Sequence, residues 1–432
     1  MSGKDSFDVL NKIFIPKNGN QDFKGYTIKY GNIVDNGEVI DEVLVSYFKA
    51  PKSYTTENMC EINSHGGTVI INKILDLCIK NGATLAEPGE FTKRAFLNGR
   101  IDLSQAEAVI DVINSKTEKE AKVSVEQLEG NLSNKISSIR KKVISMMADI
   151  EATIDYPEYD LEEVTNEKIS DTLDEVDIIL ESLEKSFYNG KILREGISTA
   201  IIGRPNAGKS SLLNLILNEE RAIVTDVEGT TRDSIEEYIS IDGIPLKIID
   251  TAGIRNATDE VERIGVEKAI NIAKKSDIII AIFDISKELN DEDEKILNLL
   301  KEKNGIILLN KIDLDEKIDL TKFNNINKKV IKVSIKNREG IDELYGAISE
   351  MFKLKDIAND GETIVSNLRH KNIIINTRKN LKEAKETIKN NMPIDIISSY
   401  LKEMLEELGK ITGETVTEDV INEIFSKFCL GK

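Results

Sequence analysis

An apolar strand that runs directly into a glycine-rich turn is the feature that most restricts the fold of this chain. The apolar run 197–202 is followed by Gly203-Arg-Pro-Asn-Ala-Gly-Lys-Ser210 and then by a helical pattern at 211–217. This spacing between a strand and a helix is typical of a phosphate-binding loop. Backbone N–H groups of such a loop bind negative charge, while Lys209 is expected to reach the β- and γ-phosphates and Ser210 to bind Mg²⁺. The sequence therefore predicts a nucleotide-binding domain.

The stretch 196–353 repeats this alternation of apolar runs and helical patterns. Its apolar runs lie at 197–202, 245–249, 278–283, 306–309 and 330–333. Strands that alternate with helices of about ten to fifteen residues predict an α/β domain with the doubly wound sheet of a P-loop NTPase. Asp242-Gly243 is a hairpin signal between 235–241 and 245–249, so one edge strand should run antiparallel.

Two motifs at strand ends predict recognition of guanine. Asn310-Lys-Ile-Asp313 follows the run 306–309, and the carboxylate of Asp313 can accept both N–H groups of a guanine edge, a pair that adenine cannot supply. Ser334 follows the run 330–333, where the last loop would present a backbone N–H to the base oxygen. GTP and GDP are therefore the expected ligands.

Two further motifs complete the set that is expected around the γ-phosphate. Asp250-Thr-Ala-Gly253 ends a strand, so that Asp250 would approach Mg²⁺ and the N–H of Gly253 would approach the γ-phosphate. Gly229-Thr-Thr-Arg-Asp233 precedes the hairpin, and Thr231 could complete the Mg²⁺ shell. All four motifs occur in the order that a GTPase requires.

The residue that orients the attacking water is not settled by these motifs. Ile254 occupies the position where many small GTPases place a glutamine, and its side chain cannot orient water. Glu260 and Glu262 lie on the same loop, and arginines are available against developing charge. These arginines are Arg232, Arg255 and Arg263. Each of these residues is more often a surface residue than a catalyst, so the choice stays open at this point.

The segments on both sides of 196–353 are predominantly helical. Apolar positions recur at three- and four-residue intervals from Ser104 onward, with an interruption expected near Gly130, and the pattern returns after residue 353. Residues 1–98 mix a strand-like run at 42–48 with a helical pattern at 68–80. The basic stretch 369–389 is interpreted as a solvated helix face, with a surface for tRNA or a protein partner as the alternative.

Composition excludes several classes of protein. The chain has 58 Lys and Arg against 76 Asp and Glu, a net charge of −18, so contact with a phosphate backbone needs a local basic face or a partner. Three cysteines without short spacing and two histidines exclude a sequence-local zinc site and a multi-histidine metal centre. The start shows no secretory signal and no apolar run could span a bilayer. We therefore expect a reduced, cytoplasmic protein without membrane contact.

The motifs together resemble the MnmE (TrmE) family of tRNA-modification GTPases. The residues that carry the resemblance are Gly203–Ser210, Gly229–Asp233, Asp250–Arg255 with Val261-Glu-Arg-Ile-Gly265, His65-Gly-Gly67, Pro88–Arg100 and Cys429-Leu-Gly-Lys432. They cover essentially the whole chain and come from all three of its regions.

This resemblance implies three domains. An α+β tetrahydrofolate-binding and dimerisation domain is expected at 1–98, a helical domain at 99–195 and 354–432, and an inserted G domain at 196–353. It also implies an FAD-dependent partner, MnmG, in a heterotetramer. The two proteins would add an aminomethyl or carboxymethylaminomethyl group to C5 of the wobble uridine of tRNA. A tetrahydrofolate derivative (5,10-methylene- or 5-formyl-) is the implied cofactor.

The resemblance further implies a potassium-activated GTPase whose G domains pair across two subunits. It places K⁺ at Asn206, Thr225, Val227 and Thr230, and Mg²⁺ at Ser210 and Thr231. By position, Glu262 becomes the water-orienting residue, which acts beside Lys209 and Gly253. The GTP-binding set is then Asn206, Ala207, Gly208, Lys209, Ser210, Ser211, Thr225, Asp226, Val227, Glu228, Gly229, Thr230, Thr231, Asp250, Thr251, Ala252, Gly253, Asn310, Lys311, Asp313 and Ser334.

In the folate domain the family's ligands match Glu61, Arg100 and Lys432. Family sequences carry a strand and a Gly-rich loop before the residues that match Ser2-Gly3, with an arginine expected at the folate. This sequence starts after that strand, so we expect a folate site that lacks a basic ligand and a strand, and the implied N-terminal dimerisation stays open. Cys429 has two interpretations, a small buried residue or a thiol near the folate.

Two other classes of function compete with this one. A ribosome-assembly GTPase that binds RNA would usually carry an added RNA-binding module or a second G domain, and neither is evident in the sequence. A GTP-dependent scaffold, in which hydrolysis is incidental, is the third possibility.

Overall fold

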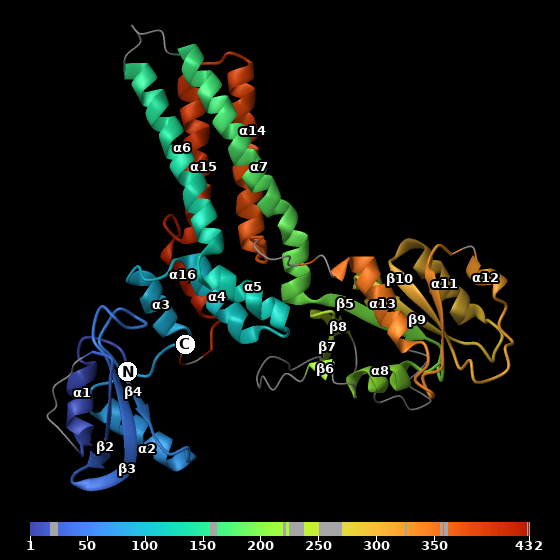
Figure 1. Cartoon of the computed structure of the whole chain (residues 1–432), viewed down its shortest axis with the longest axis horizontal. Coiled ribbons are helices and arrows are strands. Elements are labelled where there is room, and N and C mark those ends of the chain that lie inside the picture. The colour runs from blue at the N-terminus through green and yellow to red at the C-terminus, as the bar shows by residue number, and fades with distance from the viewer. Residues whose placement is uncertain are drawn as a thin grey trace. The chain divides into compact units, whose positions relative to one another are not determined.

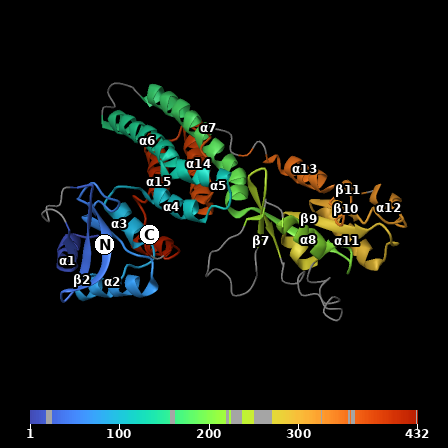
Figure 2. The same cartoon turned by 60° about the horizontal axis from the view of Figure 1, so that its bottom comes forward.

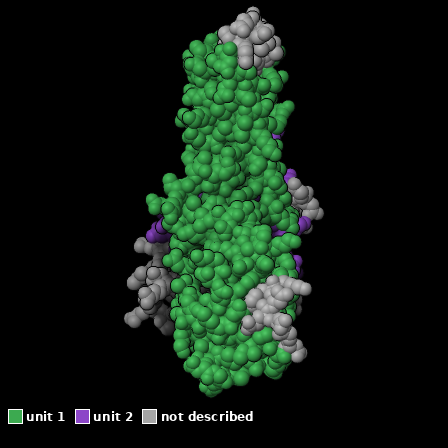
Figure 3. Space-filling model, turned by 90° about the vertical axis from the view of Figure 1, so that its left-hand side faces the viewer, with its two compact units in different colours: residues 1–110, 126–176, 376–432 green, residues 111–125, 177–375 purple. Residues whose placement is uncertain are grey.

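The computed structural model describes residues 1–17, 25–155, 162–218, 222–223, 237–249, 270–324, 326–354, 357, 362–429 and 431. The chain forms two compact units, coloured separately in Figure 3. Unit 1 comprises Met1–Ile110, Glu126–Val176 and Asn376–Lys432, and unit 2 comprises Asp111–Val125 and Asp177–Ile375.

A four-stranded antiparallel sheet occupies the N-terminal part of unit 1 (Figure 1). Its strands, in spatial order, are β1 (Phe14–Pro16), β2 (Thr27–Asp35), β3 (Glu38–Phe48) and β4 (Met59–Asn63). Side chains alternate along β3, where Val43 and Val45 are buried and Leu44 between them is exposed. The buried face packs against α1 (Ser6–Ile13) and α2 (Thr68–Lys80), which contribute Leu10 and Leu77 to one core. The strand predicted at 42–48 and the helix predicted at 68–80 are confirmed.

Helices make up the rest of unit 1. They include α3 (Glu90–Leu97), α6 (Asn131–Asp155), α15 (Ile394–Thr412) and α16 (Glu418–Phe425). α6 and α15 lie side by side in both views (Figures 1 and 2) and bury residues at three- and four-residue spacing, such as Ile136 and Val143 on α6 and Leu401 on α15. The predicted interruption near Gly130 is confirmed, because Gly130 has φ +97 and separates two helices.

Four helices have residues in both units. They are α4 (Leu103–Asn114), α5 (Glu118–Leu128), α7 (Glu162–Glu195) and α14 (Leu368–Lys389). Two of the lysines on α14 contact groups of their own unit: Lys371 Nζ lies 4.5 Å from the centroid of the Phe187 ring, and Lys385 forms a 2.6 Å ion pair with Asp174. These two lysines of the basic stretch 369–389 therefore have partners within the chain, and the choice between a solvated helix face and a surface for tRNA or a protein partner stays a prediction.

Unit 2 is built on a seven-stranded mixed sheet within the part of the chain that the structure describes. Its strands are β5 (Ile197–Gly203), β6 (Ala222–Ile223), β7 (Glu237–Ile241), β8 (Ile244–Ile248), β9 (Ile278–Asp284), β10 (Gly305–Asn310) and β11 (Lys329–Val333). The spatial order is β11-β10-β9-β5-β8-β7-β6; pairing is parallel from β11 to β8 and antiparallel from β8 to β6. This order confirms the predicted parallel sheet and its antiparallel edge.

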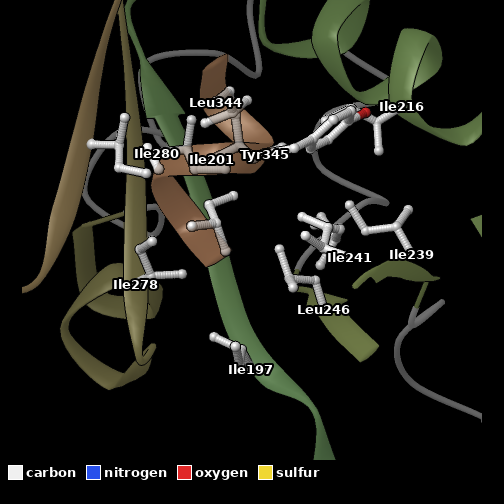
Figure 4. Packing of buried hydrophobic residues seen from close by; sticks show 14 of the residues in the cluster. Ile197, Ile201, Ile216, Ile239, Ile241, Leu246, Ile278, Ile280, Leu344 and Tyr345 are labelled. Carbon is white, nitrogen blue, oxygen red and sulfur yellow. The ribbon is translucent and has the colours of Figure 1, made fainter. Parts of the chain in front are cut away.

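Helices cover both faces of this sheet, because its central strands are apolar on both sides. These helices include α8 (Lys209–Leu217), α11 (Asp291–Glu302), α12 (Thr321–Asn324) and α13 (Ile341–Phe352). Figure 4 shows one of the two cores, in which side chains of β5 and β9, such as Ile201 and Ile280, gather with Leu344 and Tyr345 of α13. Phe283 of β9 belongs to the opposite core, together with residues of α11. This is a doubly wound arrangement, in which the carboxyl ends of the parallel strands meet at one edge.

The segment Asp111–Val125 belongs to unit 2, although most of α4 and its surroundings belong to unit 1. Val123 packs against the core of the mixed sheet, and Arg194 at the end of α7 forms a 2.9 Å ion pair with Asp111. Glu120 is 5% exposed and accepts a 2.7 Å hydrogen bond from the backbone N–H of Lys116. Burial raises the pKa of Glu120 to about 7.

The raised pKa of Glu120 predicts a pH-dependent contribution to stability. The folded chain holds the proton above pH 4.5, so the stabilisation is complete below that value and is lost as pH rises through about 7. Glu120→Gln keeps a neutral side chain at every pH. The free energy of unfolding of the variant should therefore gain roughly 2 kcal/mol relative to the wild type between about pH 5.5 and about pH 8.5. Urea unfolding of both proteins at both pH values measures this difference. If the difference between variant and wild type is the same at about pH 5.5 and about pH 8.5, the raised pKa of Glu120 is contradicted.

Candidate nucleotide-binding site

The phosphate-binding loop joins β5 to α8 as predicted, and its backbone conformation explains its glycines. Asn206 and Gly208 have φ values of +60 and +115, in the left-handed region. A Cβ atom on Gly203 would clash with the carbonyl of Ile282, and one on Gly208 would clash with the side-chain amide of Asn310. The close approach of neighbouring segments therefore requires both glycines, and at Gly208 the positive φ of the turn is a second requirement.

Lys209, the first residue of α8, has its ammonium group at the mouth of this loop. Its Nζ donates hydrogen bonds of 2.9 Å to the carbonyl of Gly203 and 2.7 Å to that of Arg204. Ser210 and Ser211 follow in the first turn of the helix, and both are exposed. A cation, a hydroxyl and the N-terminus of a nine-residue helix thus lie together, the combination that binds phosphates.

Arg204 anchors the loop from the outside, a contact that the sequence analysis did not predict. Its Nε lies 3.0 Å from the carboxylate of Asp293, whose side chain is fully buried, and its Nη1 donates to the carbonyl of Glu288 at 3.1 Å. Burial raises the pKa of Asp293, while an N–H donor from Asn290 and the Arg204 charge act in the opposite direction. Asp293 and Asn290 also form the capping box of α11, so the guanidinium is held by a rigid helix end.

Asn310 connects the phosphate-binding loop to the loop that follows β11. It is 3% exposed at the end of β10. Its Nδ2 donates to the carbonyl of Ala207 at 2.8 Å, and its Oδ1 accepts from the backbone N–H of Ile335 at 3.2 Å. One side chain therefore uses both of its polar atoms to fix the positions of two nucleotide-binding loops relative to each other.

Lys311 forms a second link at the same edge of the sheet. Its Nζ lies 2.6 Å from Asp284, which ends β9 and pairs in register with Asn310. Burial by itself would raise the pKa of Asp284, but hydrogen bonds from Lys311 and Ser286 lower it below its ordinary value. Asp284 was not among the predicted site residues, although its position directly after the apolar run 278–283 was an available signal.

Asp313 and Ser334 are brought together as the guanine motif requires. The hydroxyl of Ser334 donates to Asp313 at 2.7 Å and holds the pKa of that exposed carboxyl below its usual range. The carboxylate therefore remains a pure acceptor at neutral pH. The backbone N–H of Ser334 donates to the carbonyl of Glu339 at 3.2 Å, and its hydroxyl also accepts from the backbone N–H of Asn337 at 3.3 Å. Both groups of Ser334 therefore shape the base loop.

Several predicted site residues lie outside the described residues. They are Thr225, Asp226, Val227, Glu228, Gly229, Thr230, Thr231, Asp250, Thr251, Ala252, Gly253, Glu262 and Lys432, together with Arg232, Ile254, Arg255, Glu260 and Arg263. Within the described ranges, no group of three His, Cys, Asp or Glu side chains is placed to hold a metal ion. In those ranges, none of the helices combines the length and apolar character needed to cross a bilayer.

The predicted folate residues occupy separate elements of unit 1. Glu61 is exposed on β4, while the guanidinium of Arg100 lies 4.7 Å from the centroid of the Tyr54 ring and donates to the Tyr54 carbonyl at 3.0 Å. A cavity of about 620 Å³ lies near the N-terminus, but neither Glu61 nor Arg100 lines it. Cys429 is exposed, so its interpretation as a small buried residue is wrong.

Two models of known protein families match this chain. The family model of the MnmE helical domain matches residues 103–429, and that of the GTP-binding protein TrmE N-terminus matches residues 1–100.

Three relatives, each named tRNA modification GTPase MnmE, match all of this chain and 95% of their own length. The protein of Acetivibrio thermocellus is 50% identical over 439 residues, that of Finegoldia magna 50% over 432, and that of Clostridioides difficile 48% over 436. This chain therefore belongs to the MnmE family.

Proposed function

We propose that this chain is an enzyme that hydrolyses GTP in the service of tRNA modification. The observation that carries the proposal is the side chain of Asn310, which holds the phosphate-binding loop at Ala207 and the base-binding loop at Ile335. This frame supports binding of a whole guanine nucleotide. The tRNA role is supported by relatives about half identical over the full length of this chain, each of which is named a tRNA modification GTPase.

Mg²⁺ is the proposed metal of the hydrolytic step. Ser210 and Thr231 would bind it directly, and the carboxylate of Asp250 would act on it from outside the ligand shell. Ser210 is an exposed residue beside Lys209 in the first turn of α8, and a hydroxyl oxygen is a ligand that suits a hard cation such as Mg²⁺. When bound, the metal neutralises charge on the β- and γ-phosphates. Lys209 would bind the same phosphates, Gly253 would donate its N–H to the γ-phosphate and Glu262 would orient the attacking water.

K⁺ is proposed as the activating ion, held by Asn206, Thr225, Val227 and Thr230. Of these four residues the structure describes Asn206. It is exposed and has a left-handed backbone conformation within the phosphate-binding loop, so its side chain can offer an amide oxygen there. A compact cation at this place would stabilise developing charge in the role that an arginine plays in other GTPases. Pairing of G domains from two subunits would enclose it.

The proposed reaction partner is an MnmG-type FAD protein in a heterotetramer. The two proteins would modify C5 of the wobble uridine of tRNA in the cytoplasm, with a tetrahydrofolate derivative as one-carbon donor. Residues 1–100 match the TrmE N-terminus, and this is the domain to which we assign the folate ligand. Arg100 and Lys432 would bind carboxylates of such a ligand, and Glu61 could accept hydrogen bonds from its pterin ring.

Asp313→Asn should change the base that the enzyme accepts. The side-chain amide of the variant carries an N–H donor that would face the C2 amino group of guanine, which is also a donor. Xanthine has a carbonyl at C2, which can accept a hydrogen bond from this amide. The loss of two hydrogen bonds to a charged acceptor should weaken GTP binding about 100-fold or more. Hydrolysis of xanthosine triphosphate should be gained in parallel. Steady-state turnover of both nucleotides by wild type and variant measures this; retained preference for GTP contradicts the assignment of Asp313.

Replacement of K⁺ by Na⁺ should slow GTP turnover about tenfold or more, because the smaller ion fits the same oxygen cage poorly. GDP affinity in the two salts provides the control, since a change in binding alone would reflect ionic conditions. Equal GTP turnover in K⁺ and Na⁺ at matched ionic strength would contradict activation by K⁺.

The tRNA role is tested in cells that lack this gene. Nucleoside analysis of their tRNA should show loss of the C5-modified wobble uridine, and the intact gene should restore it. A gene that encodes Lys209→Ala should fail to restore it. Normal modification in the deletion strain would contradict the proposed role in tRNA while leaving GTP hydrolysis untouched.

A further inference from the structure

The segment Asp111–Val125 contacts both ends of the β7–β8 hairpin within unit 2. Lys116 Nζ lies 4.1 Å from the centroid of the ring of Tyr238, near the start of β7. At the other end, a Cβ atom on Gly243 would lie 3.1 Å from both Cγ and Cδ of Lys119. The turn therefore rests directly on the aliphatic stem of this lysine.

Other contacts fix the same turn to α13. Lys119 Nζ donates to the carbonyl of Leu354 at 3.3 Å, beyond the end of α13, and the hydroxyl of Ser349 on that helix donates to Asp242 in the turn. Asp242 and Gly243 both have positive φ, +50 and +78, as a tight hairpin requires. The hairpin is held as a rigid piece between α5 and α13.

The β7–β8 hairpin lies between the two predicted switch motifs in the sequence. β7 starts just after the predicted switch motif Gly229–Asp233, and β8 ends just before Asp250-Thr-Ala-Gly253. In the antiparallel register Glu237 lies opposite Ile248, so both switch motifs attach to the sheet at neighbouring residues. A small displacement of the hairpin would move both attachment points together.

The outer side of the hairpin lies near the edge of the sheet and has little strand pairing. Among the described strands, only the two-residue β6 pairs with the outer side of β7. Short edge pairs of this kind are marginal by themselves. The segment that carries Lys116 is itself fixed, because Glu120 accepts from the Lys116 backbone N–H and Asp111 pairs with Arg194.

We propose that Lys116 and Lys119 are positioning residues for GTP hydrolysis, which hold the β7–β8 hairpin and thereby set the place from which both switch motifs leave the sheet. The inference rests on the proposed GTPase function. Neither lysine belongs to the predicted nucleotide-binding set. Their loss should therefore affect the chemical step, which is sensitive to displacements of about 1 Å, and spare nucleotide binding.

Lys116→Met and Lys119→Met, singly and together, retain the apolar stem and remove the ammonium group. In the double variant kcat for GTP should fall about fivefold to tenfold, while KM and the Kd for GDP stay within about twofold. Arginine at the same positions should restore kcat. Lys135→Met, at an exposed lysine of α6, is the matched control and should change nothing. Unchanged kcat, or a loss confined to KM and GDP affinity, overturns the inference.

Hydrogen exchange separates this inference from the proposed function. If the wild type does not hydrolyse GTP, the proposed function fails, but exchange of the β7 and β8 amides still tests the support. It should be faster in the double variant than in the wild type and the Lys135→Met control. Equal exchange overturns the inference. Where the double variant loses its thermal transition, the same comparison is made with Lys116→Met, which removes the ammonium group near the Tyr238 ring.

Discussion

The buried side chain of Asn310 is the interaction on which the nucleotide site depends. Its two polar atoms are bound to the carbonyl of Ala207 and the N–H of Ile335, and at 3% exposure no bulk water can replace either partner. Each such hydrogen bond contributes only about 1 kcal/mol net, but a buried group left without a partner costs about 1–3 kcal/mol. The phosphate-binding loop and the base-binding loop therefore form one structure. Gly208 follows from the same constraint, because the Asn310 amide leaves no room for a Cβ atom.

Three links at the carboxyl edge of the sheet extend this frame. Lys311 is tied to Asp284, Arg204 to Asp293 at the start of α11, and Asp313 to Ser334. Each link joins segments that are distant in sequence and brings them together at this edge. The chemistry of the site is thus presented by rigid strand and helix ends, which is the arrangement that binding of a specific nucleotide requires.

The sequence predicted the parts of this site that depend on local pattern. Apolar runs predicted β9, β10 and β11, Asp242-Gly243 predicted the antiparallel hairpin, and motif spacing predicted the phosphate-binding loop. The link from Arg204 to Asp293 was not predictable in this way, because a pairing between distant segments leaves no local signal. Asp284 carried one local signal, its position at the end of an apolar strand, but its partner Lys311 was not evident from that position. The helical period of 104–154 likewise did not reveal that Asp111–Val125 packs with unit 2, since periodicity identifies a buried face without its partner.

The central claim, that Asn310 couples phosphate binding to base binding, is tested most directly by calorimetry with Asn310→Ala and Asp313→Ala. Each variant and the wild type is titrated with GDP, ADP and inorganic triphosphate. If the coupling exists, Asp313→Ala should lose the preference for GDP over ADP and keep its affinity for triphosphate, whereas Asn310→Ala should lose both. Retention of wild-type triphosphate affinity by Asn310→Ala would contradict the claim, because the phosphate-binding loop would then keep its form without the Asn310 side chain.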